Sequence, residues 1–338
     1  MRRSSRANSA GEWAVEQTAE PLNGSERTWL ILNPAARKGR AEREWPTIAA
    51  RLRSRGVVFT QAMTCGPSDA TMLAQQALAD GATQLIVVGG DGTLNEVVNG
   101  LAIARTVNTN LPTLALIPLG TGVDFARGHG IHSLDDALAT LHHGSHHTID
   151  LGLAHFRDAG GQERERFFVN VADCGLGPTA SQQIARVDRR LATGAYLYGA
   201  LRAIAAYAPT PTRITVDDHV VYEAPCGLLA IGNGRYFGGG MAITPRAHID
   251  DGLLDVVILG ATDRRTLVGE LLPRVYRGSH LRHPAVHFAR GTTITVEAEP
   301  PLPLELDGEI VGTTPVTVTL RQSYLRLLVP PVGAHSIR

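Results

Sequence analysis

The stretch VVGGDGTLNE at residues 87–96 holds residue types suited to binding phosphate. An apolar run ends there, three glycines surround Asp91 within four positions, and a helix is predicted to begin near Thr93. Glycines let a backbone approach a ligand closely, and a helix N-terminus presents unpaired N–H groups. The charge of Asp91 would oppose a phosphate unless a metal ion or a ligand hydroxyl intervenes. We interpret this turn as an anion-binding site, and the alternative is a plain turn with a capping Asp.

A second turn of the same kind follows the next predicted strand, in PLGTGVDFAR at residues 118–127. In a doubly wound α/β sheet, the carboxyl ends of neighbouring strands face one crevice. The two turns would then share that crevice with Asn33 and Arg37, which follow the first strand. Three strand ends that converge on one place support a ligand site better than any one of them alone.

Lysine is nearly absent, and this narrows the possible mechanisms. Lys38 is the only lysine, so 31 of the 32 basic residues are arginines. Neither GxxxxGK(S/T) nor VAIK is present, which excludes a P-loop NTPase and a protein kinase. Nothing around Lys38 supports a pyridoxal-phosphate enzyme.

The first half of the chain alternates short apolar runs with amphipathic helical segments. One helix is predicted from Gly39 to about Arg55. A second is predicted after Ser68, which would be its N-terminal cap, and a third after the glycine turn at 89–92. The predicted strands are residues 28–33, 57–60, 84–88 and 113–118. Uninterrupted apolar strands between helices favour the α/β class, with a doubly wound, mainly parallel sheet.

The pattern changes near residue 148. Short, turn-bounded apolar runs follow without a helix after each, and they predict an antiparallel sandwich of two sheets. The predicted runs are residues 148–154, 167–172, 213–216, 228–233, 254–259, 293–298, 316–320 and 325–329. Two helical segments, at 194–208 and 264–276, interrupt them.

Length and composition exclude several classes of protein. At 338 residues, with 43% hydrophobic and 19% charged residues, the chain is predicted to be globular. We expect a disordered extension over 1–26, an α/β domain over 27–150 and a β-sandwich domain over 151–330. Basic and acidic residues both total 32, so no basic excess supports binding to nucleic acid. Three cysteines without CxxC spacing, and no long apolar run, favour a cytoplasmic protein.

The motifs, in this order, resemble one family. GGDGTLNEVVNGL and PLGTGVDFAR, preceded by LNPAARKGR, resemble the diacylglycerol kinase catalytic domain, specifically the bacterial soluble lipid kinases. The resemblance continues through ADCGLG (172–177), IGNGRYFGGGMAITPRAHIDDGLLDV (231–256) and LELDGE (304–309), and so covers residues 28–329. It implies an ATP-binding first domain, a lipid-binding second domain, a cleft between them and a C-terminal strand that returns to the first domain.

The resemblance also implies two cofactors, ATP and Mg²⁺, and the residues that contact ATP. These are Asn33, Pro34, Ala35, Ala36, Arg37, Thr64, Gly89, Gly90, Asp91, Gly92, Thr93, Leu94, Asn95, Glu96, Gly120, Thr121 and Gly122. Asp251, with the backbone of Leu253 and of His248, matches a structural magnesium site of the family.

Catalysis is assigned to carboxylates. Glu309 resembles the family's base, which takes the proton from a lipid hydroxyl, and Asp91 is expected to be essential for ATP-dependent activity. Asp307 lies two residues before Glu309, so on a strand both carboxylates would point the same way and could serve as a base with a metal ligand or orienting group. The alternative for this DGE segment is a hairpin turn, because Asp-Gly is a strong turn signal.

At one position the sequence departs from the family. Val123 stands where the family has an asparagine, so a β-branched apolar group replaces an amide. This keeps a catalytically weak pseudokinase that binds nucleotide or lipid as an alternative. An NAD kinase, which shares a GGDG turn, is a second alternative and is disfavoured because the sequence has no TGSTAY-like segment.

The sequence leaves the lipid acceptor undefined, and a homodimer is an open alternative to a monomer. We expect the lipid substrate to be met at the membrane surface, by peripheral contact with its inner face. The apolar helix predicted at 194–208 could line an acyl-chain groove or belong to the core. Arg264, Arg265, Arg274 and Arg277 could meet anionic headgroups or form a solvated face.

Overall fold

The computed structural model describes residues 16–17, 27–106, 110–120, 122–185, 204–205 and 207–331. The chain divides into two compact units. Unit 1 comprises Met1–Ile149 and Leu325–Arg338, and unit 2 comprises Asp150–Tyr324. Apart from residues 16–17, the extension at 1–26 lies outside the described residues, as does most of the helix expected at 194–208.

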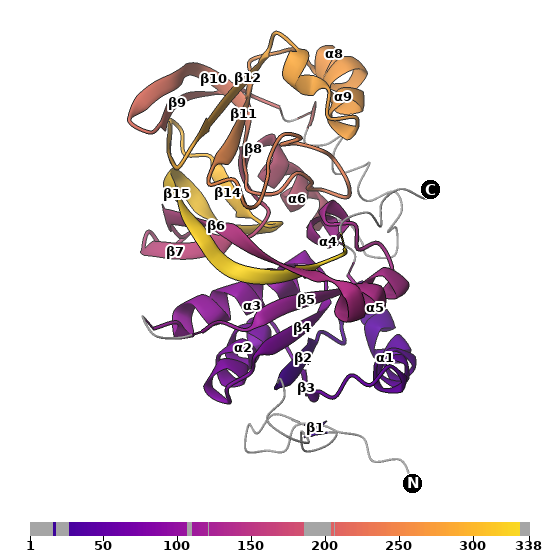
Figure 1. Ribbon diagram of the computed structural model, residues 1–338. Coiled ribbons are helices and arrows are strands. Elements are labelled where there is room, and N and C mark those ends of the chain that lie inside the picture. The colour runs from indigo at the N-terminus through magenta and orange to yellow at the C-terminus, as the bar shows by residue number, and fades with distance from the viewer. Residues whose placement is uncertain are drawn as a thin grey trace. The chain divides into compact units, whose positions relative to one another are not determined.

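Unit 1 is built on a parallel sheet of buried apolar strands (Figure 1). Its strands are β2 (Thr28–Leu32), β3 (Thr60–Met63), β4 (Gln84–Gly89) and β5 (Thr113–Pro118), in the order β3-β2-β4-β5. The short strand β1 (Glu16–Gln17) pairs antiparallel with β3. The end of β15 (Glu309–Val329) pairs parallel with β5, Leu327 opposite Leu114. All of β2 is buried, as expected for a strand covered on both faces.

Helices connect and cover these strands. They are α1 (Ala36–Ser54), α2 (Asp69–Ala79), α3 (Asp91–Ala104), α4 (Asp124–Gly128) and α5 (Leu134–His143). In Figure 1, α2 and α3 lie on one side of the strands, and α1 and α5 lie on the other. Helices α2 and α3 pack closely at Gly100, where an added Cβ would lie 2.3 Å from the carbonyl oxygen of Thr71.

One strand of unit 1 begins later than the sequence predicts. The strand expected at 57–60 starts at Thr60, which pairs with Trp29 of β2. The residues just before Thr60 follow the C-terminal end of α1, and the N–H of Val57 still donates to the carbonyl of Leu52 in that helix at 3.1 Å. The end of the helix thus sets the start of the strand.

Unit 2 is β-rich, which confirms that part of the prediction. Its strands are β6 (Ser145–Arg157, which starts in unit 1), β7 (Glu163–Phe168), β8 (Val171–Gly175), β9 (Thr210–Val216), β10 (His219–Gly232), β11 (Leu254–Gly260), β12 (Val286–Gly291), β13 (Thr293–Ala298), β14 (Pro303–Leu306) and most of β15. The pairings form a closed circuit, β15-β13-β9-β10-β8-β14-β15, and β11 and β12 extend from β10. Strands β10 and β15 each pair with different neighbours along their length.

Alternating side chains of these strands form the main core of unit 2. It includes Cys174, Ile214, Ile231, Val256, Ile294, Leu304 and Val316, all buried. A smaller apolar cluster lies on the opposite face of β8, β10 and β11. That face is covered by α6 (Leu176–Ala185) and by a helical segment of three parts, α8 (Arg264–Thr266), the π-helical η2 (Leu267–Leu271) and α9 (Leu272–Tyr276), before the short η3 (His280–Arg282). No helix in the described part of the chain is long and apolar enough to span a bilayer.

Two buried carboxyl groups lie side by side in this sheet. Asp173 of β8 and Glu305 of β14 are opposite each other in register and are 2% and 5% exposed. Burial raises the pKa of Asp173 well above its usual value, and repulsion by Glu305 adds to the rise. Burial likewise raises the pKa of Glu305. Among the described residues, Asp173 Oδ2 and Glu305 Oε2 have no hydrogen-bond partner, so both groups favour their neutral forms.

We expect Asp173→Asn to stabilise the protein at alkaline pH. Above about pH 4 the unfolded chain releases its carboxyl protons while the folded chain keeps this one, so the free energy of unfolding falls as pH rises toward the raised pKa. The variant lacks this loss, so its advantage in free energy of unfolding should be small near pH 4 and grow toward pH 8. Urea unfolding across pH measures it, with the exposed Asp218→Asn as the control. A wild-type pH slope in Asp173→Asn would contradict the prediction.

Candidate functional site

Two glycine turns of unit 1 lie in direct backbone contact at the carboxyl ends of β4 and β5. A Cβ added to Gly90 would lie 2.5 Å from the carbonyl oxygen of Gly122. One added to Gly120 would lie 2.3 Å from the Cα of Gly90. The N–H of Asp91 donates to the carbonyl of Gly122 at 3.0 Å. The structure therefore brings these two turns together, and no side chain larger than hydrogen fits between them.

Asp91 binds the N-terminus of α4. Its carboxylate accepts the N–H groups of Asp124 at 2.8 Å and Phe125 at 3.2 Å. The first N–H groups of a helix lack partners within it, and the helix dipole favours a negative charge there. Val123 is at the N-terminal cap position of α4 and makes no side-chain cap. Asp91 supplies that cap from the neighbouring turn.

Asn33 joins the first strand end to the same turns. Its Nδ2 donates to Thr93 Oγ1 at 3.1 Å, and its Oδ1 accepts the N–H of Ala35 at 3.1 Å. Thr93 is buried and packs on Gly89, where an added Cβ would lie 2.7 Å from Thr93 Oγ1. Asn33 thus ties the end of β2 to the first turn of α3.

The chain after Asn33, including the first residues assigned to α1, has an unusual backbone. Residues 34–36 lead into three consecutive residues in the left-handed region, Arg37 (φ 51°), Lys38 (φ 61°) and Gly39 (φ 78°). For Arg37 and Lys38 this conformation costs about 1 kcal/mol or more each, because their Cβ crowds the backbone. Such strain clusters at ligand sites. The sequence predicted Arg37 as a site residue but not Lys38. The one feature of the sequence that could have pointed to Lys38 is that it is the only lysine.

Two of the residues expected at ATP have structural partners. Thr64 is buried after β3, and its N–H donates to the carbonyl of Leu32 at 2.9 Å. Glu96 accepts the N–H groups of Ser68 at 3.1 Å and Ala70 at 3.2 Å. Ser68 itself has φ 66° and makes no side-chain cap. Ser68 is therefore the N-cap residue of α2, as predicted, but the carboxylate that accepts the N–H groups there belongs to Glu96 of α3.

Other residues expected at ATP lie in the first turns of α3. Gly92 is half-buried, while Leu94 and Asn95 are buried at 4% and 0% exposure. Their side chains pack inside unit 1, so a ligand at this turn would meet backbone rather than these side chains. Thr121 lies outside the described residues.

In unit 2 the DGE segment forms a tight hairpin between β14 and β15. Leu306 pairs with Glu309, and the two residues between them, Asp307 and Gly308, have φ of 47° and 89°. Positive φ at both positions is the requirement of a type I′ turn. The prediction that the carboxylates of Asp307 and Glu309 lie on one strand face is therefore wrong, because the chain reverses between them.

Asp307 binds the backbone of a neighbouring bend. Its carboxylate accepts the N–H groups of Val169 at 2.8 Å, Asn170 at 2.9 Å and Val171 at 3.1 Å. These bonds hold the bend between β7 and β8, a stretch that the sequence presented as one run over 167–172. Asp307 thus has a structural role in unit 2.

Glu309 pairs with Arg166 of β7. The Arg166 Nη2 atom lies 2.6 Å from Glu309 Oε2, and the two side chains are 25% and 42% exposed. The ion pair orients the carboxylate while leaving it accessible to a substrate. Sequence reasoning missed Arg166, because nothing in ERERFF distinguishes it from Arg164.

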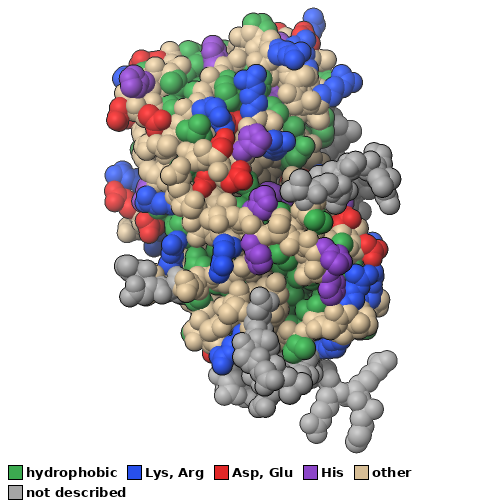
Figure 2. Space-filling model, viewed as in Figure 1, with side chains coloured by type: hydrophobic (Ala, Val, Ile, Leu, Met, Phe, Trp, Pro, Cys, Tyr) green, Lys and Arg blue, Asp and Glu red, His purple; other side chains and the backbone are tan. Residues whose placement is uncertain are grey.

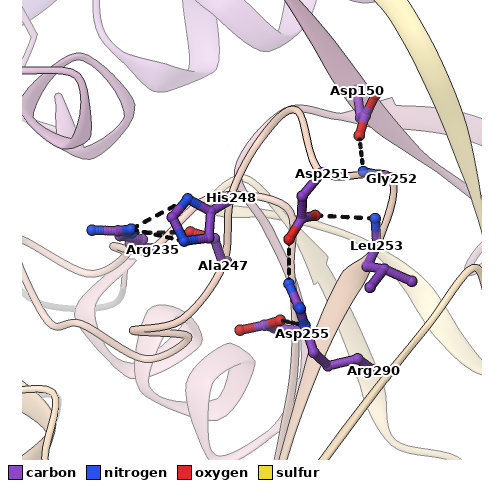
Figure 3. Close-up of polar contacts among 9 residues, drawn as sticks. All are labelled: Asp150, Arg235, Ala247, His248, Asp251, Gly252, Leu253, Asp255 and Arg290. Carbon is purple, nitrogen blue, oxygen red and sulfur yellow. Dashed lines mark hydrogen bonds and ion pairs between the residues drawn. The ribbon is translucent and has the colours of Figure 1, made fainter.

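The residues expected to bind a structural magnesium ion lie in the turn before β11 (Figure 3). The Oδ1 atom of Asp251 accepts the N–H of Leu253 at 3.1 Å, and its Oδ2 pairs with the Arg290 guanidinium. The His248 ring points toward Arg235, with its Nε2 3.3 Å from Arg235 Nη2.

This arrangement does not fit a magnesium ion. Arg290 also binds Asp255, which is fully buried, with 2.6 Å between Arg290 Nε and Asp255 Oδ1. Burial raises the pKa of Asp255, and the guanidinium opposes the rise. Mg²⁺ needs free oxygen ligands and is repelled by cations, yet a guanidinium already occupies the Asp251 carboxylate. Over the described residues, no group of three or more His, Cys, Asp or Glu side chains could hold a metal ion.

An apolar cavity of about 150 Å³ lies in unit 2, between the sheet and its helical cover. Its walls include Leu228, Leu259, Phe237, Leu267, Leu271 and Val275. The buried ring of His280 also lines it, with Nε2 2.9 Å from the carbonyl oxygen of Ile243. Burial lowers the pKa of His280, which favours the neutral ring. A cavity with such walls suits a hydrocarbon chain better than a polar ligand.

Comparison with known protein families divides the chain at a similar place. The diacylglycerol kinase catalytic domain model matches residues 27–154. The model for the YegS C-terminal NAD kinase beta sandwich-like domain matches residues 170–329. The two matches follow one another along the chain and include every site residue expected from the sequence, while Arg166 lies between them.

Individual relatives match along most of their length. A diacylglycerol kinase of Mycobacterium tuberculosis is 30% identical over 305 residues, covering 90% of this chain and 95% of the relative. A Chromohalobacter salexigens protein named "probable lipid kinase YegS-like" is 32% identical over 302 residues, covering 87% and 90%. A Bacillus anthracis crystal structure of a "putative diacylglycerol kinase" superposes with a TM-score of 0.71 at 27% identity, over 90% of this chain and 98% of that one. A Bacillus anthracis structure described as a diacylglycerol kinase superposes with a TM-score of 0.67 at 26% identity, over 90% and 97%.

We expect Gly120→Ala to destabilise unit 1, because its Cβ would overlap the Cα of Gly90 and force the turns apart. Overpacking of this kind costs about 1–3 kcal/mol or more. Denaturant unfolding measures the loss. The matched control is Gly269→Ala, where nothing lies within 4 Å of the added Cβ. This control should be neutral or slightly stabilising. Equal effects of the two variants would contradict the prediction that overlap with Gly90 causes the loss.

The turn at Asp251 yields a second prediction. Because Arg290 supplies the positive charge there, EDTA should leave the thermal unfolding temperature of the protein unchanged. Arg290→Met leaves the carboxylates of Asp251 and Asp255 without a counter-charge and should lower the free energy of unfolding by about 1–3 kcal/mol, since the ion pair is partly exposed. A fall in unfolding temperature with EDTA that Asp251→Asn abolishes would instead support a metal site.

Proposed function

The chain belongs to the diacylglycerol kinase family, and from this premise we propose that it transfers the γ-phosphoryl group of ATP, with Mg²⁺, to the hydroxyl of a lipid alcohol such as diacylglycerol. Family membership supports a lipid kinase. The nucleotide, the metal ion and the acceptor are the parts that we propose.

The apolar cavity of unit 2 carries the lipid part of the proposal. A kinase acting on a small polar molecule gains nothing from a cavity with walls of Leu, Val and Phe side chains. An acyl chain gains by leaving water for such a place, by roughly 0.8 kcal/mol for each CH₂ group buried. We therefore assign the cavity to part of the acceptor's hydrocarbon chain.

The nucleotide is assigned to the strand ends of unit 1. Phosphoryl transfer depends mainly on positioning and on neutralising phosphate charge. The N-terminus of α3 begins at the Gly90 turn and makes no side-chain cap, so its N–H groups suit phosphate oxygens. Mg²⁺ bound with ATP would neutralise part of the phosphate charge. Asp91 is held against α4 by two N–H bonds, so we assign it to fixing the two turns in place.

Glu309 is the proposed base. Oε2 is held by Arg166, and the Glu309 side chain is 42% exposed. Since Arg166 binds Oε2, we assign the proton of the lipid hydroxyl to Oε1. Arg166 acts by keeping the carboxylate in one orientation.

Val123 motivates a second candidate, a protein that binds nucleotide without turnover. The structure weakens this candidate on one point: the helix cap that an asparagine at 123 could supply is supplied by Asp91. Loss of the amide therefore leaves α4 capped. Binding of ATP without product would still favour this second candidate over the kinase.

The test is incubation of the purified protein with labelled ATP, Mg²⁺ and a panel of lipid alcohols in detergent micelles. We expect a phosphorylated lipid, and we expect Glu309→Gln to lower turnover by roughly 10²–10⁴ with ATP binding retained. The matched control is Glu297→Gln, an exposed strand glutamate, which should act as wild type. Label transfer to NAD, or to no acceptor at all, would reject the proposal, and an unchanged rate in Glu309→Gln would reject the base alone.

A further inference from the structure

The helical segment α8–η2–α9 has one face turned toward the apolar cavity. Leu267, Leu271 and Val275 line the cavity from this segment, spaced four residues apart. A π-helical stretch from Leu267 to Leu271 keeps this spacing in line, since a π-turn advances the pattern by one residue. The segment is therefore a lid of side chains over the cavity on its inner face.

The outer face combines cations with exposed apolar groups. Val268 is 42% exposed and Tyr276 is 55% exposed, although burying either side chain would be favourable in free energy. Arg264, Arg265 and Arg277 of the same segment are exposed as well.

The charge of this segment differs from that of the whole chain. Residues 261–283 contain five arginines and two carboxylates, whereas the chain has no net charge. Asp263 caps the N-terminus of α8, where its carboxylate accepts two backbone N–H bonds. Glu270 lies within ion-pair distance of Arg274, at 3.6 Å, and of His283, at 3.7 Å.

Three arginines of this segment, Arg264, Arg265 and Arg277, lie exposed on its surface. Within the described part of the chain, no carboxylate pairs with Arg264, Arg265 or Arg277. Figure 2 shows Lys and Arg side chains gathered at the top of the molecule, over the region that Figure 1 labels α8, with apolar groups between them. This surface offers several positive charges to one partner.

We propose that this outer face, defined by Arg264, Arg265, Val268, Tyr276 and Arg277, docks on the surface of an anionic lipid bilayer. Guanidinium groups bind lipid phosphates through two N–H groups at once. A tyrosine suits the boundary between headgroups and acyl chains, and a valine beside it adds buried apolar area. A bilayer is the partner that offers both a continuous negative surface and a hydrocarbon layer beneath it.

The cavity on the inner face of the same segment strengthens this choice. Docking would place the segment between the bilayer and an apolar cavity, so that a lipid chain has a short route from one to the other. This part of the inference rests on the proposed function, which assigns a lipid chain to the cavity. The docking surface itself rests on charge and exposure alone.

The test is co-sedimentation of the full chain with vesicles of phosphatidylcholine, with and without phosphatidylglycerol. The wild type should bind the phosphatidylglycerol vesicles and leave the pure phosphatidylcholine vesicles largely unbound. The triple variant Arg264→Gln/Arg265→Gln/Arg277→Gln should bind at least tenfold more weakly, because each basic residue near such a surface contributes about fivefold. Val268→Ser/Tyr276→Ser should bind several-fold more weakly with no change in charge.

The matched control is Arg43→Gln/Arg53→Gln/Arg55→Gln, which removes the same charge from exposed positions of α1 and its C-terminal end. It should bind as the wild type does. Equal losses in the two triple variants would mean that net charge, not this face, governs binding, and would overturn the inference. Equal binding of the wild type to both kinds of vesicle would overturn it too.

Turnover in detergent micelles separates this inference from the proposed function. The triple variant should phosphorylate micellar lipid at the wild-type rate and vesicle lipid more slowly. Loss of turnover in micelles would show that these arginines act in catalysis or folding, against the inference. Should the wild type bind phosphatidylglycerol vesicles through these arginines yet phosphorylate no lipid, the proposed function fails and the docking surface stands.

Discussion

The contact between two backbones at Gly90 and Gly120 is the constraint on which unit 1 depends. Without side chains between them, the turns after β4 and β5 share hydrogen bonds, and the N–H of Asp91 reaches the carbonyl of Gly122. The same closeness lets the Asp91 carboxylate reach α4. The starts of α3 and α4 are therefore fixed by one contact, and with them the N–H groups that suit a phosphate. Asn33 adds the end of β2 to this arrangement through Thr93.

Much of unit 1 could be predicted because its signals are local. Apolar runs such as TWLIL read as buried strands, and glycine turns mark where those strands end. The convergence of the turns then follows from the geometry of parallel sheets. In unit 2 the Asp-Gly pair signalled its hairpin just as locally, and the strand alternation applied to Asp307 and Glu309 gave the wrong result because a turn separates them.

The missed features are pairings of carboxylates with groups far away in sequence. Glu96 caps a helix that begins more than 25 residues before it, and Asp307 binds a bend about 137 residues away. Arg290 reaches Asp251 across 39 residues. Spacing along a chain identifies neighbours on one helix or strand, but it does not indicate which distant group a charge will meet. For this reason the sequence did not reveal that Arg290 pairs with Asp251, or that Glu96 binds the start of α2.

Strand β15 has a consequence for how the protein is made. It starts in unit 2 beside the hairpin turn and ends in unit 1, where Leu327 lies opposite Leu114. During translation, residues 1–149 therefore leave the ribosome long before the end of β15, which pairs with β5. Until translation finishes, the outer N–H and C=O groups of β5 lack that partner and can template association with other nascent chains. A gene fragment stopped near codon 150 would encode the same bare edge, so the border between the units is a poor place to divide the protein for expression.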